Sequence, residues 1–298
     1  MINKYSAKIV SRHGAHLVVK DDQGIRHTCI SSKKFSHIVC GDRVECSKID
    51  QDRDQILNIL PRKNELVRQT EYAKKSVAAN IDTIIIVCAV EPEPSLELID
   101  HYIVAAEQLP SDVVITLNKI DLENHLSIIE SLQSKYTNLP YPIVTTSKLS
   151  SIHNLDALIN LLKNKTCIFV GQSGVGKSTL INALVPNINI DTQEISDLSR
   201  QGRHTTSSTT LYDLPLGGEL IDSPGVREFV MPKLDAKSIS KGFVEIEKFR
   251  NECKFHNCIH IQEPKCAVLE AVKENRINKQ RYESYLKMMD NIKEENYQ

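Results

Sequence analysis

A glycine-rich segment that ends in lysine and serine has the residue types and spacing to hold a phosphate chain. Glycines let backbone N–H groups wrap phosphates, a lysine reaches the β- and γ-phosphates, and a serine hydroxyl ligates Mg²⁺. A strand pattern at 166–170 precedes the segment and a helix pattern at 177–184 follows it, as this loop requires. The sequence therefore predicts a nucleoside triphosphate site with Mg²⁺, in which Lys177 also acts in catalysis and Ser178 ligates the metal. The predicted phosphate-binding residues are Gly171, Gln172, Ser173, Gly174, Val175, Gly176, Lys177, Ser178 and Thr179.

An Asn-Lys-x-Asp motif, formed by Asn118, Lys119 and Asp121, predicts which base is bound. A carboxylate at the end of a strand can accept two hydrogen bonds from the N1–H and the exocyclic amine of guanine, and adenine offers no such pair. Ser147 and Lys148 follow the next strand pattern and would add contacts to the base, although a polar strand end without a ligand is the alternative. The motif therefore predicts GTP rather than ATP.

An Asp-x-x-Gly motif lies 44 residues after Ser178 and contains Asp222 and Gly225. In P-loop GTPases such an aspartate holds Mg²⁺ and the glycine N–H contacts the γ-phosphate. The polar stretch 186–208 before it includes Thr205 and Thr206, and a threonine in such a loop can close over Mg²⁺ and the γ-phosphate. We expect a switch loop here, with a simple flexible connection as the alternative.

Hydrolysis also requires a positioned water molecule. Many GTPases place a glutamine directly after the Asp-x-x-Gly motif, but this chain has Val226 there, which cannot orient water. His204 in the predicted switch loop is the candidate for this catalytic role, while contact with RNA or packing is the alternative.

The order of the motifs predicts a circularly permuted domain. In ordinary GTPases the phosphate loop comes first, whereas here the base motif precedes it by about fifty residues. Strand patterns at 81–90, 113–117 and 142–146 alternate with helix patterns, as in a parallel α/β sheet. Such a sheet can close again because domain termini usually lie near one another.

The two ends of the chain predict separate domains around this centre. Residues 1–66 contain five short strand patterns and 12 Lys and Arg against 8 Asp and Glu, which favours an RNA-binding barrel of the oligonucleotide-binding (OB) kind over a generic β domain. The predicted GTPase domain, 67–232, has a net charge of −7, and residues 233–298 look helical with a net charge of +2. Basic flanks suit a polyanion such as RNA, but ordinary surface scatter would give the same charges.

Three of the eight cysteines are bunched in the C-terminal part, with two histidines between them. Cys253, Cys258, His260 and Cys266 would suit tetrahedral zinc, and four protein ligands would make the site structural. His256 is a competing ligand, and unligated residues are the alternative. The dispersed cysteines are expected to be small buried hydrophobic residues, namely Cys29, Cys40, Cys46, Cys88 and Cys167.

Composition places the chain among ordinary globular proteins. Hydrophobic residues make up 41% and charged residues 25%, which excludes wholesale disorder. The longest apolar run, 84–90, is too short to cross a bilayer, and no signal-peptide pattern precedes the first strand. We expect a cytoplasmic protein with no membrane partner, and nothing in the sequence requires more than a monomer.

Together, the permuted motifs, the Gly-Arg-His-Thr-Thr loop at 202–206, the preceding barrel and the Cys-x4-Cys-x-His-x5-Cys cluster resemble the bacterial ribosome small subunit-dependent GTPase A family. The resemblance covers almost the whole chain. It implies that the protein acts in late maturation of the 30S ribosomal subunit. It also implies that the barrel and the zinc domain contact 16S rRNA. It also implies that the subunit stimulates hydrolysis of GTP to GDP and phosphate, that hydrolysis drives release, and that His204 acts in catalysis.

Two other functions stay open on the residues alone. One is a guanine-nucleotide-dependent RNA-binding scaffold in which turnover is incidental. The other is a P-loop ATPase or small-molecule kinase, which the Asn-Lys-x-Asp motif disfavours.

Overall fold

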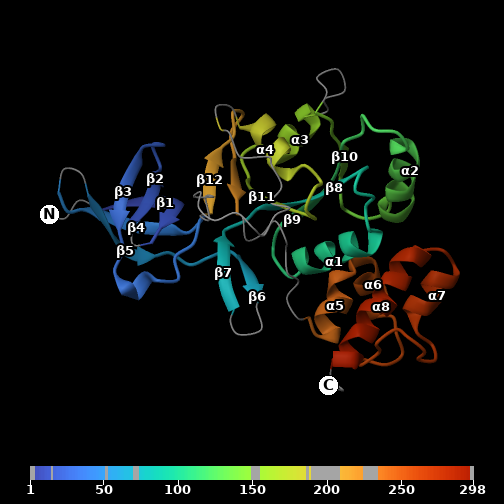
Figure 1. Ribbon diagram of the computed structural model, residues 1–298. Coiled ribbons are helices and arrows are strands. Elements are labelled where there is room, and N and C mark those ends of the chain that lie inside the picture. The colour runs from blue at the N-terminus through green and yellow to red at the C-terminus, as the bar shows by residue number, and fades with distance from the viewer. Residues whose placement is uncertain are drawn as a thin grey trace.

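The chain folds into three parts arranged side by side. The computed structural model describes residues 4–14, 16–50, 53–69, 74–148, 155–185, 188, 209–223 and 234–295. An N-terminal barrel and a C-terminal group of helices lie on opposite sides of a central sheet (Figure 1). The three-part architecture predicted from the sequence is therefore confirmed.

The N-terminal part is a closed barrel of five strands. Their spatial order is β1-β2-β3-β5-β4, and β4 pairs back onto β1. Alternate residues point inward and form a core that includes Ile9, Leu17, Val19 and Cys29. The predicted barrel is confirmed, and its elements are β1 (Lys4–His13), β2 (His16–Asp21), β3 (Arg26–Ile30), a short 3-10 turn (Lys33–Phe35), β4 (Arg43–Lys48) and β5 (Asp54–Ile59).

A hairpin that the sequence patterns did not predict follows the barrel. It consists of β6 (Glu65–Gln69) and β7 (Lys74–Ala79), which pair with each other in a separate two-stranded sheet. Leu66 and Ala78 anchor it in the same hydrophobic core as the central sheet. Strand β6 spans the expected division between the first two domains.

Five parallel strands form the central sheet, in the spatial order β10-β9-β8-β11-β13. Every residue of β8 and of β11 is buried, because apolar cores cover both faces. Ile84 and Ile86 of β8 face one core, whereas Ile85 and Val87 face the other. The strands are β8 (Thr83–Ala89), β9 (Asp112–Asn118), β10 (Ile143–Thr145), β11 (Thr166–Val170) and β13 (Glu219–Asp222).

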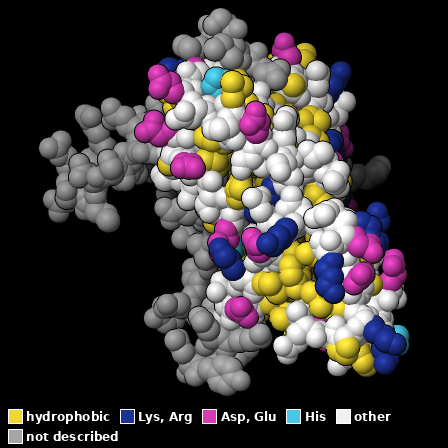
Figure 2. Space-filling view, turned by 90° about the vertical axis from the view of Figure 1, so that its right-hand side faces the viewer, with side chains coloured by type: hydrophobic (Ala, Val, Ile, Leu, Met, Phe, Trp, Pro, Cys, Tyr) yellow, Lys and Arg dark blue, Asp and Glu magenta, His cyan; other side chains and the backbone are white. Residues whose placement is uncertain are grey.

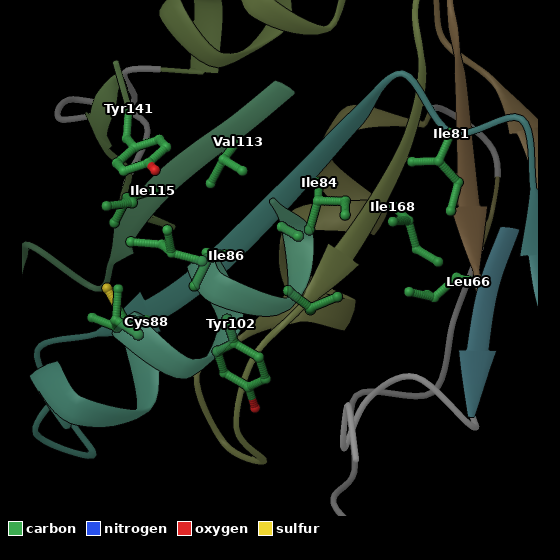
Figure 3. Packing of buried hydrophobic residues seen from close by; sticks show 14 of the residues in the cluster. Leu66, Ile81, Ile84, Ile86, Cys88, Tyr102, Val113, Ile115, Tyr141 and Ile168 are labelled. Atoms are coloured by element: carbon green, nitrogen blue, oxygen red, sulfur yellow. The ribbon is translucent and has the colours of Figure 1, made fainter. Parts of the chain in front are cut away.

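Helices from the connections between these strands cover the two faces. In Figure 3, Tyr102 lies below the row formed by Ile86 and Ile115, and the same core extends to Leu66 and Ile81 at its other end. Ser95 begins the first helix by accepting a hydrogen bond from the backbone N–H of Leu98. The helices are α1 (Leu96–Ala106) and α2 (His125–Tyr136) on this face, and α3 (Leu155–Leu162) and α4 (Lys177–Leu184) on the other.

One antiparallel strand joins the barrel to the central sheet. Strand β12 (Thr210–Asp213) pairs with β13 on one side and meets β1 on the other, at Ser11 opposite Thr210. The barrel and the central strands therefore form one 11-stranded sheet.

The C-terminal helices pack on α1. Val104 of α1 belongs to their hydrophobic core, and Gly242 lies so close that a Cβ atom there would be 2.6 Å from the Val104 side chain. The helices are α5 (Ala236–Gly242), α6 (Val244–Arg250), α7 (Ala267–Lys273) and α8 (Lys279–Glu295). The predicted helical C-terminal part is confirmed.

A buried ionic network fastens these helices to the central part. Arg281 of α8 is fully buried and forms ion pairs with Asp100 of α1 at 2.6 Å and with Glu245 of α6 at 2.7 Å. Lys135 of α2 contacts the other oxygen of Asp100 at 2.7 Å, and the Tyr136 hydroxyl donates to Asp100. The two carboxylates and the two cations neutralise each other in the protein interior. Removing one of these four side chains therefore leaves a buried charge without its full set of partners.

Replacing Arg281 by methionine should lower the free energy of unfolding by roughly 3–5 kcal/mol, because Glu245 would lose its cation and Asp100 one of two. Arg53→Met is the matched control: Arg53 pairs with Asp50 at an exposed site, where an ion pair contributes about 1 kcal/mol or less. The chain has no tryptophan, so urea unfolding is followed by circular dichroism. Equal losses in both variants would contradict the role given to the buried network.

Candidate nucleotide and metal sites

The motif residues meet at one edge of the central sheet. Strand β8 pairs in parallel with β9 on one side, with Ala89 opposite Asn118, and with β11 on the other. Parallel strands end at the same edge, and ligands of open α/β sheets bind outside that edge. Asn118 ends β9, the glycine-rich loop follows β11, and Asp222 ends β13. The permuted chain order therefore still collects the base and phosphate motifs in one place.

The glycine-rich loop depends on a close approach to β8. Gly171 has a φ of +146°, and a Cβ atom there would lie 2.1 Å from the carbonyl oxygen of Val87. Any larger residue would push the loop away from the strand. Gly174 and Gly176 also have positive φ values, which places the turn before α4 in a backbone conformation that glycine adopts without strain.

Lys177, the first residue of α4, is buried within the loop. Its Nζ donates to the carbonyl oxygen of Gly171 at 2.8 Å and to that of Gln172. Ser178 and Thr179 follow in the first turn and are half-buried, whereas Gln172 and Ser173 are exposed. The arrangement holds an ammonium group at the mouth of a loop whose backbone N–H groups can meet an anion.

A hydrogen bond ties the base motif to this loop. Asn118 is buried, and its Nδ2 donates to the carbonyl oxygen of Val175 at 2.9 Å. Its Oδ1 accepts from the Thr146 hydroxyl at 3.1 Å. The side chain of Asn118 thus holds the end of β9, the phosphate-loop segment and the turn after β10 together.

The remaining base-motif residues follow β9 and β10. The Ser147 hydroxyl donates a hydrogen bond to the Asp121 carboxylate. The side chains of Asp121 and Lys148 are exposed. Lys119 has a φ of +62°, and its Nζ donates to the carbonyl oxygen of Glu91 at 2.7 Å. These residues lie together at the edge that carries Asn118.

Asp222 is half-buried at the end of β13, opposite Thr210 in the ladder. Directly after it, the Ser223 hydroxyl accepts a hydrogen bond from Thr209 at 2.9 Å. Sequence reasoning missed this bond, which joins the residue directly after the predicted switch stretch to the Asp-x-x-Gly motif. Four predicted site residues lie outside the described residues: His204, Thr205, Thr206 and Gly225.

The predicted cysteine cluster is assembled in the C-terminal part. One ligand atom from each of Cys253, Cys258, His260 and Cys266 lies within 4.8 Å of the others. Cys253 Sγ is 3.8 Å from Cys266 Sγ, and His260 Nδ1 is 3.5 Å from both sulfur atoms. His256, the competing ligand, is exposed and is not in the group. The four residues can hold a metal ion.

Neighbouring residues shape this cluster. The Glu263 carboxylate accepts hydrogen bonds from the backbone N–H groups of Ile259 and Ile261, and sequence reasoning missed it although it lies between two ligands. The Tyr282 hydroxyl of α8 donates to the carbonyl oxygen of His260 at 2.8 Å. Burial lowers the pKa of His260, so its imidazole is neutral at pH 7 and has a lone pair available to a metal.

The other cysteines confirm the expectation made for them. All five are buried, and each lies in a hydrophobic cluster of the barrel or the central sheet. Burial raises the pKa of Cys88 and of Cys167 to about 12, which keeps both thiols protonated.

A cleft of about 870 Å³ lies apart from these sites, between the end of α2, α6 and the turn before α8. Figure 2 shows the face of the molecule that lies to the right in Figure 1, where a hydrophobic patch is bordered by basic and acidic side chains. None of the predicted nucleotide or metal residues that the structure describes lines the cleft. Among the described residues, no helix is long and apolar enough to cross a membrane.

The cluster predicts that the purified protein contains about one metal ion per chain by elemental analysis. Cys258→Ser should reduce the metal content at least tenfold, because it removes one of four converging ligands. Cys40→Ala, a buried cysteine outside the cluster, is the control and should retain the metal. A metal-free wild-type protein would contradict this prediction.

Comparisons with known proteins agree with this geometry. The profile of the RsgA GTPase family matches residues 59–232. Two similar proteins are named small ribosomal subunit biogenesis GTPase RsgA: that of Haemophilus influenzae (strain 86-028NP) is 41% identical, and that of Actinobacillus pleuropneumoniae (serotype 5b, strain L20) is 42% identical. The first match covers 96% of this chain and the second 95%, and both cover 84% of the relative.

Solved structures give the same result for the fold. The crystal structure of YjeQ from Thermotoga maritima has a TM-score of 0.80 and 33% identity, covering 97% of this chain and 98% of that one. YloQ, described as a circularly permuted GTPase, has a TM-score of 0.79 and 26% identity, covering 98% and 96%. This chain belongs to the RsgA GTPase family and hydrolyses GTP with a circularly permuted domain.

Proposed function

We propose that the chain binds GTP and Mg²⁺ at the carboxyl edge of the central sheet and acts in late maturation of the small (30S) ribosomal subunit. On this proposal the subunit stimulates hydrolysis, and hydrolysis drives release of the protein. The observation that supports it best is the bond from Asn118 to Val175, which unites a guanine motif with a phosphate loop. The names of the relatives support the link to the subunit.

The phosphates would lie over the loop that begins at Gly171. Backbone N–H groups of the loop would hold the phosphate oxygens, and Lys177 would leave its two carbonyl partners to meet the β- and γ-phosphates. Ser178 and Asp222 would hold Mg²⁺ from two sides, since α4 begins and β13 ends at this edge of the sheet. Thr205, Thr206 and Gly225 are proposed contacts to Mg²⁺ and the γ-phosphate.

Guanine would lie beside Asp121, whose side chain is exposed. The Asp121 carboxylate would accept hydrogen bonds from the N1–H and the exocyclic amine, and the hydrogen bond from Ser147 would hold the carboxylate in place. Lys119 and Lys148 would flank the base, and Asn118 would hold the two motifs at a constant spacing.

We propose zinc for the cysteine cluster, with a structural role. With Zn–S bonds of about 2.3 Å and Zn–N bonds of about 2.0 Å, a tetrahedral site needs S···S separations of about 3.8 Å and N···S separations of about 3.5 Å. The distances among Cys253, Cys266 and His260 Nδ1 are 3.8, 3.5 and 3.5 Å. The four ligands leave no open position, so zinc would supply stability and no catalysis.

The barrel and the C-terminal helices would contact 16S rRNA. The net charge of residues 1–66, +4, supports a polyanionic partner for the barrel. The same proposal includes a monomeric protein in the cytoplasm, with domain limits at 1–66, 67–232 and 233–298.

His204 is the proposed group that positions the attacking water. Val226 occupies the position after the Asp-x-x-Gly motif and cannot do so. With the water poorly held in the free protein, turnover would be slow until the bound subunit orders the switch residues.

Asp121→Asn should lower the preference for GTP over ATP by at least tenfold, because an amide cannot accept both guanine hydrogen bonds. Competition between labelled GTP and unlabelled ATP measures this preference. Asp112→Asn is the control, since Asp112 is exposed at the start of β9, whereas Asp121 follows the other end of that strand, and Asp112 pairs with Lys165. An unchanged preference would refute the role given to Asp121.

Small ribosomal subunits should raise the GTP turnover of the wild-type protein strongly, whereas large subunits should not, and ATP should not replace GTP.

His204→Ala should lose at least a hundredfold of the stimulated turnover while its GTP affinity stays within about threefold of wild type, because removing a group that acts only in the transition state lowers the rate and not the binding. His256→Ala, an exposed histidine outside both sites, is the control. Full stimulated turnover of His204→Ala would refute the catalytic role, and an unstimulated wild-type protein would refute the proposed function.

A further inference from the structure

A single strand, β12, separates the barrel from the strand that ends at the proposed nucleotide site. Thr210 of β12 pairs with Ser11 of the barrel on one side and with Asp222 on the other. With strands about 4.8 Å apart, the backbone of Ser11 lies roughly 10 Å from that of Asp222. A displacement of β1 therefore has a short path to the residue proposed to hold Mg²⁺.

A second connection lies at the other end of β13, where Glu219 begins the strand. Lys20 of β2 contacts Glu219 at 2.6 Å, and Lys8 of β1 contacts the other carboxylate oxygen. Lys20 also pairs with Asp213 at the end of β12. Two barrel lysines thus hold the hairpin formed by β12 and β13.

These ion pairs are shielded from water. The side chains of Glu219, Lys20 and Lys8 are between 13% and 19% exposed. Burial alone would raise the pKa of Glu219, but hydrogen bonds and charge from Lys20 and Lys8 outweigh it and lower that pKa. Glu219 is therefore ionised at neutral pH, and salt screens its pairs less than it screens exposed ones.

Glu219 also holds the strand that carries the phosphate loop. It lies opposite Thr166, the first residue of β11, and its carboxylate accepts a hydrogen bond of 3.0 Å from the Thr166 hydroxyl. Strand β11 leads to Gly171, and β13 leads to Asp222 three residues later, a span of roughly 10 Å. One carboxylate thus joins the barrel to the starts of β11 and β13, two of the strands that end at the proposed nucleotide site.

Hydrophobic packing makes this junction continuous. Val10 and Cys40 of the barrel belong to the same buried cluster as Leu211 of β12 and Ile221 of β13. Packed cores transmit displacement because they contain few voids. The barrel and the hairpin that carries Asp222 are thus packed as one body.

We propose that Glu219, held by Lys8 and Lys20, is a positioning residue for GTP hydrolysis that couples the barrel to Asp222. A partner bound to the barrel shifts β1 and β2, and the ion pairs carry that shift into β13 and so to the Mg²⁺ position. Small displacements of reacting groups change rates strongly, so a shift of about 1 Å is enough to alter turnover a hundredfold. The inference rests on the proposed function, because it requires a partner that stimulates hydrolysis.

The test compares stimulated with unstimulated turnover at saturating small subunits. Glu219→Gln keeps the shape and removes the charge, and it should reduce the stimulation factor at least tenfold. Its KM for GTP and its affinity for the subunit should change less than threefold, because Glu219 lies at the opposite end of β13 from Asp222 and is shielded from solvent. Asp112→Asn is the matched control: this exposed aspartate (68%) begins β9 of the same sheet and pairs with Lys165 rather than with a barrel lysine.

A Lys8→Met/Lys20→Met variant tests the same coupling from the barrel side. It should lose as much stimulation as Glu219→Gln, and the triple variant should lose no more, because residues that act through one contact are not additive. Circular dichroism shows whether each variant folds. If Glu219→Gln does not fold, the stimulation of the lysine variant tests the inference by itself.

Stimulation of Glu219→Gln within twofold of wild type would overturn this inference and leave the proposed function intact. A tenfold loss of subunit affinity that accounts for the lost stimulation would also overturn it. An unstimulated wild-type protein would overturn the proposed function and this inference together.

Discussion

The parallel pairing of β8 with both β9 and β11 is the constraint on which the nucleotide site depends. It places the ends of three strands at one edge, whatever order the chain visits them in. Asn118 then bonds to Val175, which locks the base motif to the phosphate loop. A permuted chain can therefore build a GTPase site because hydrogen bonding between strands, and not chain order, determines which loops meet.

The two flanking parts attach to different regions of this site by different means. The barrel joins the β12–β13 hairpin, which ends at Asp222, through backbone pairing, ion pairs and a shared core. The C-terminal helices join α1 and α2, which flank the base motif, through the buried charges around Arg281. The barrel thus contacts the hairpin that carries Asp222, the C-terminal helices contact the helices on either side of the base motif in the chain, and the central sheet connects the two regions.

Local patterns predicted much of the fold. The strand at 166–170 and the helix at 177–184 match β11 and α4 in both bounds, because a continuous apolar run and a glycine-rich loop give strong signals. The hairpin of β6 and β7 was missed, since its short strands mix charged residues with few apolar ones and gain stability from Leu66 and Ala78 in a distant core. Its pattern alone could not reveal a core built from other segments.

By itself, the sequence determined which chemistry to expect: a phosphate-loop motif, an Asn-Lys-x-Asp motif and four residues that can hold a metal ion, because residue types and close spacing carry that information. Only the tertiary structure decided that His260 and not His256 faces the sulfur atoms, that Lys8 and Lys20 meet Glu219, and that Arg281 joins Asp100. The paired residues in the two ionic networks lie far apart in the chain, and their pairing follows from strand order and helix packing. Contacts of that kind depend on which surfaces become buried together, and no local pattern encodes them.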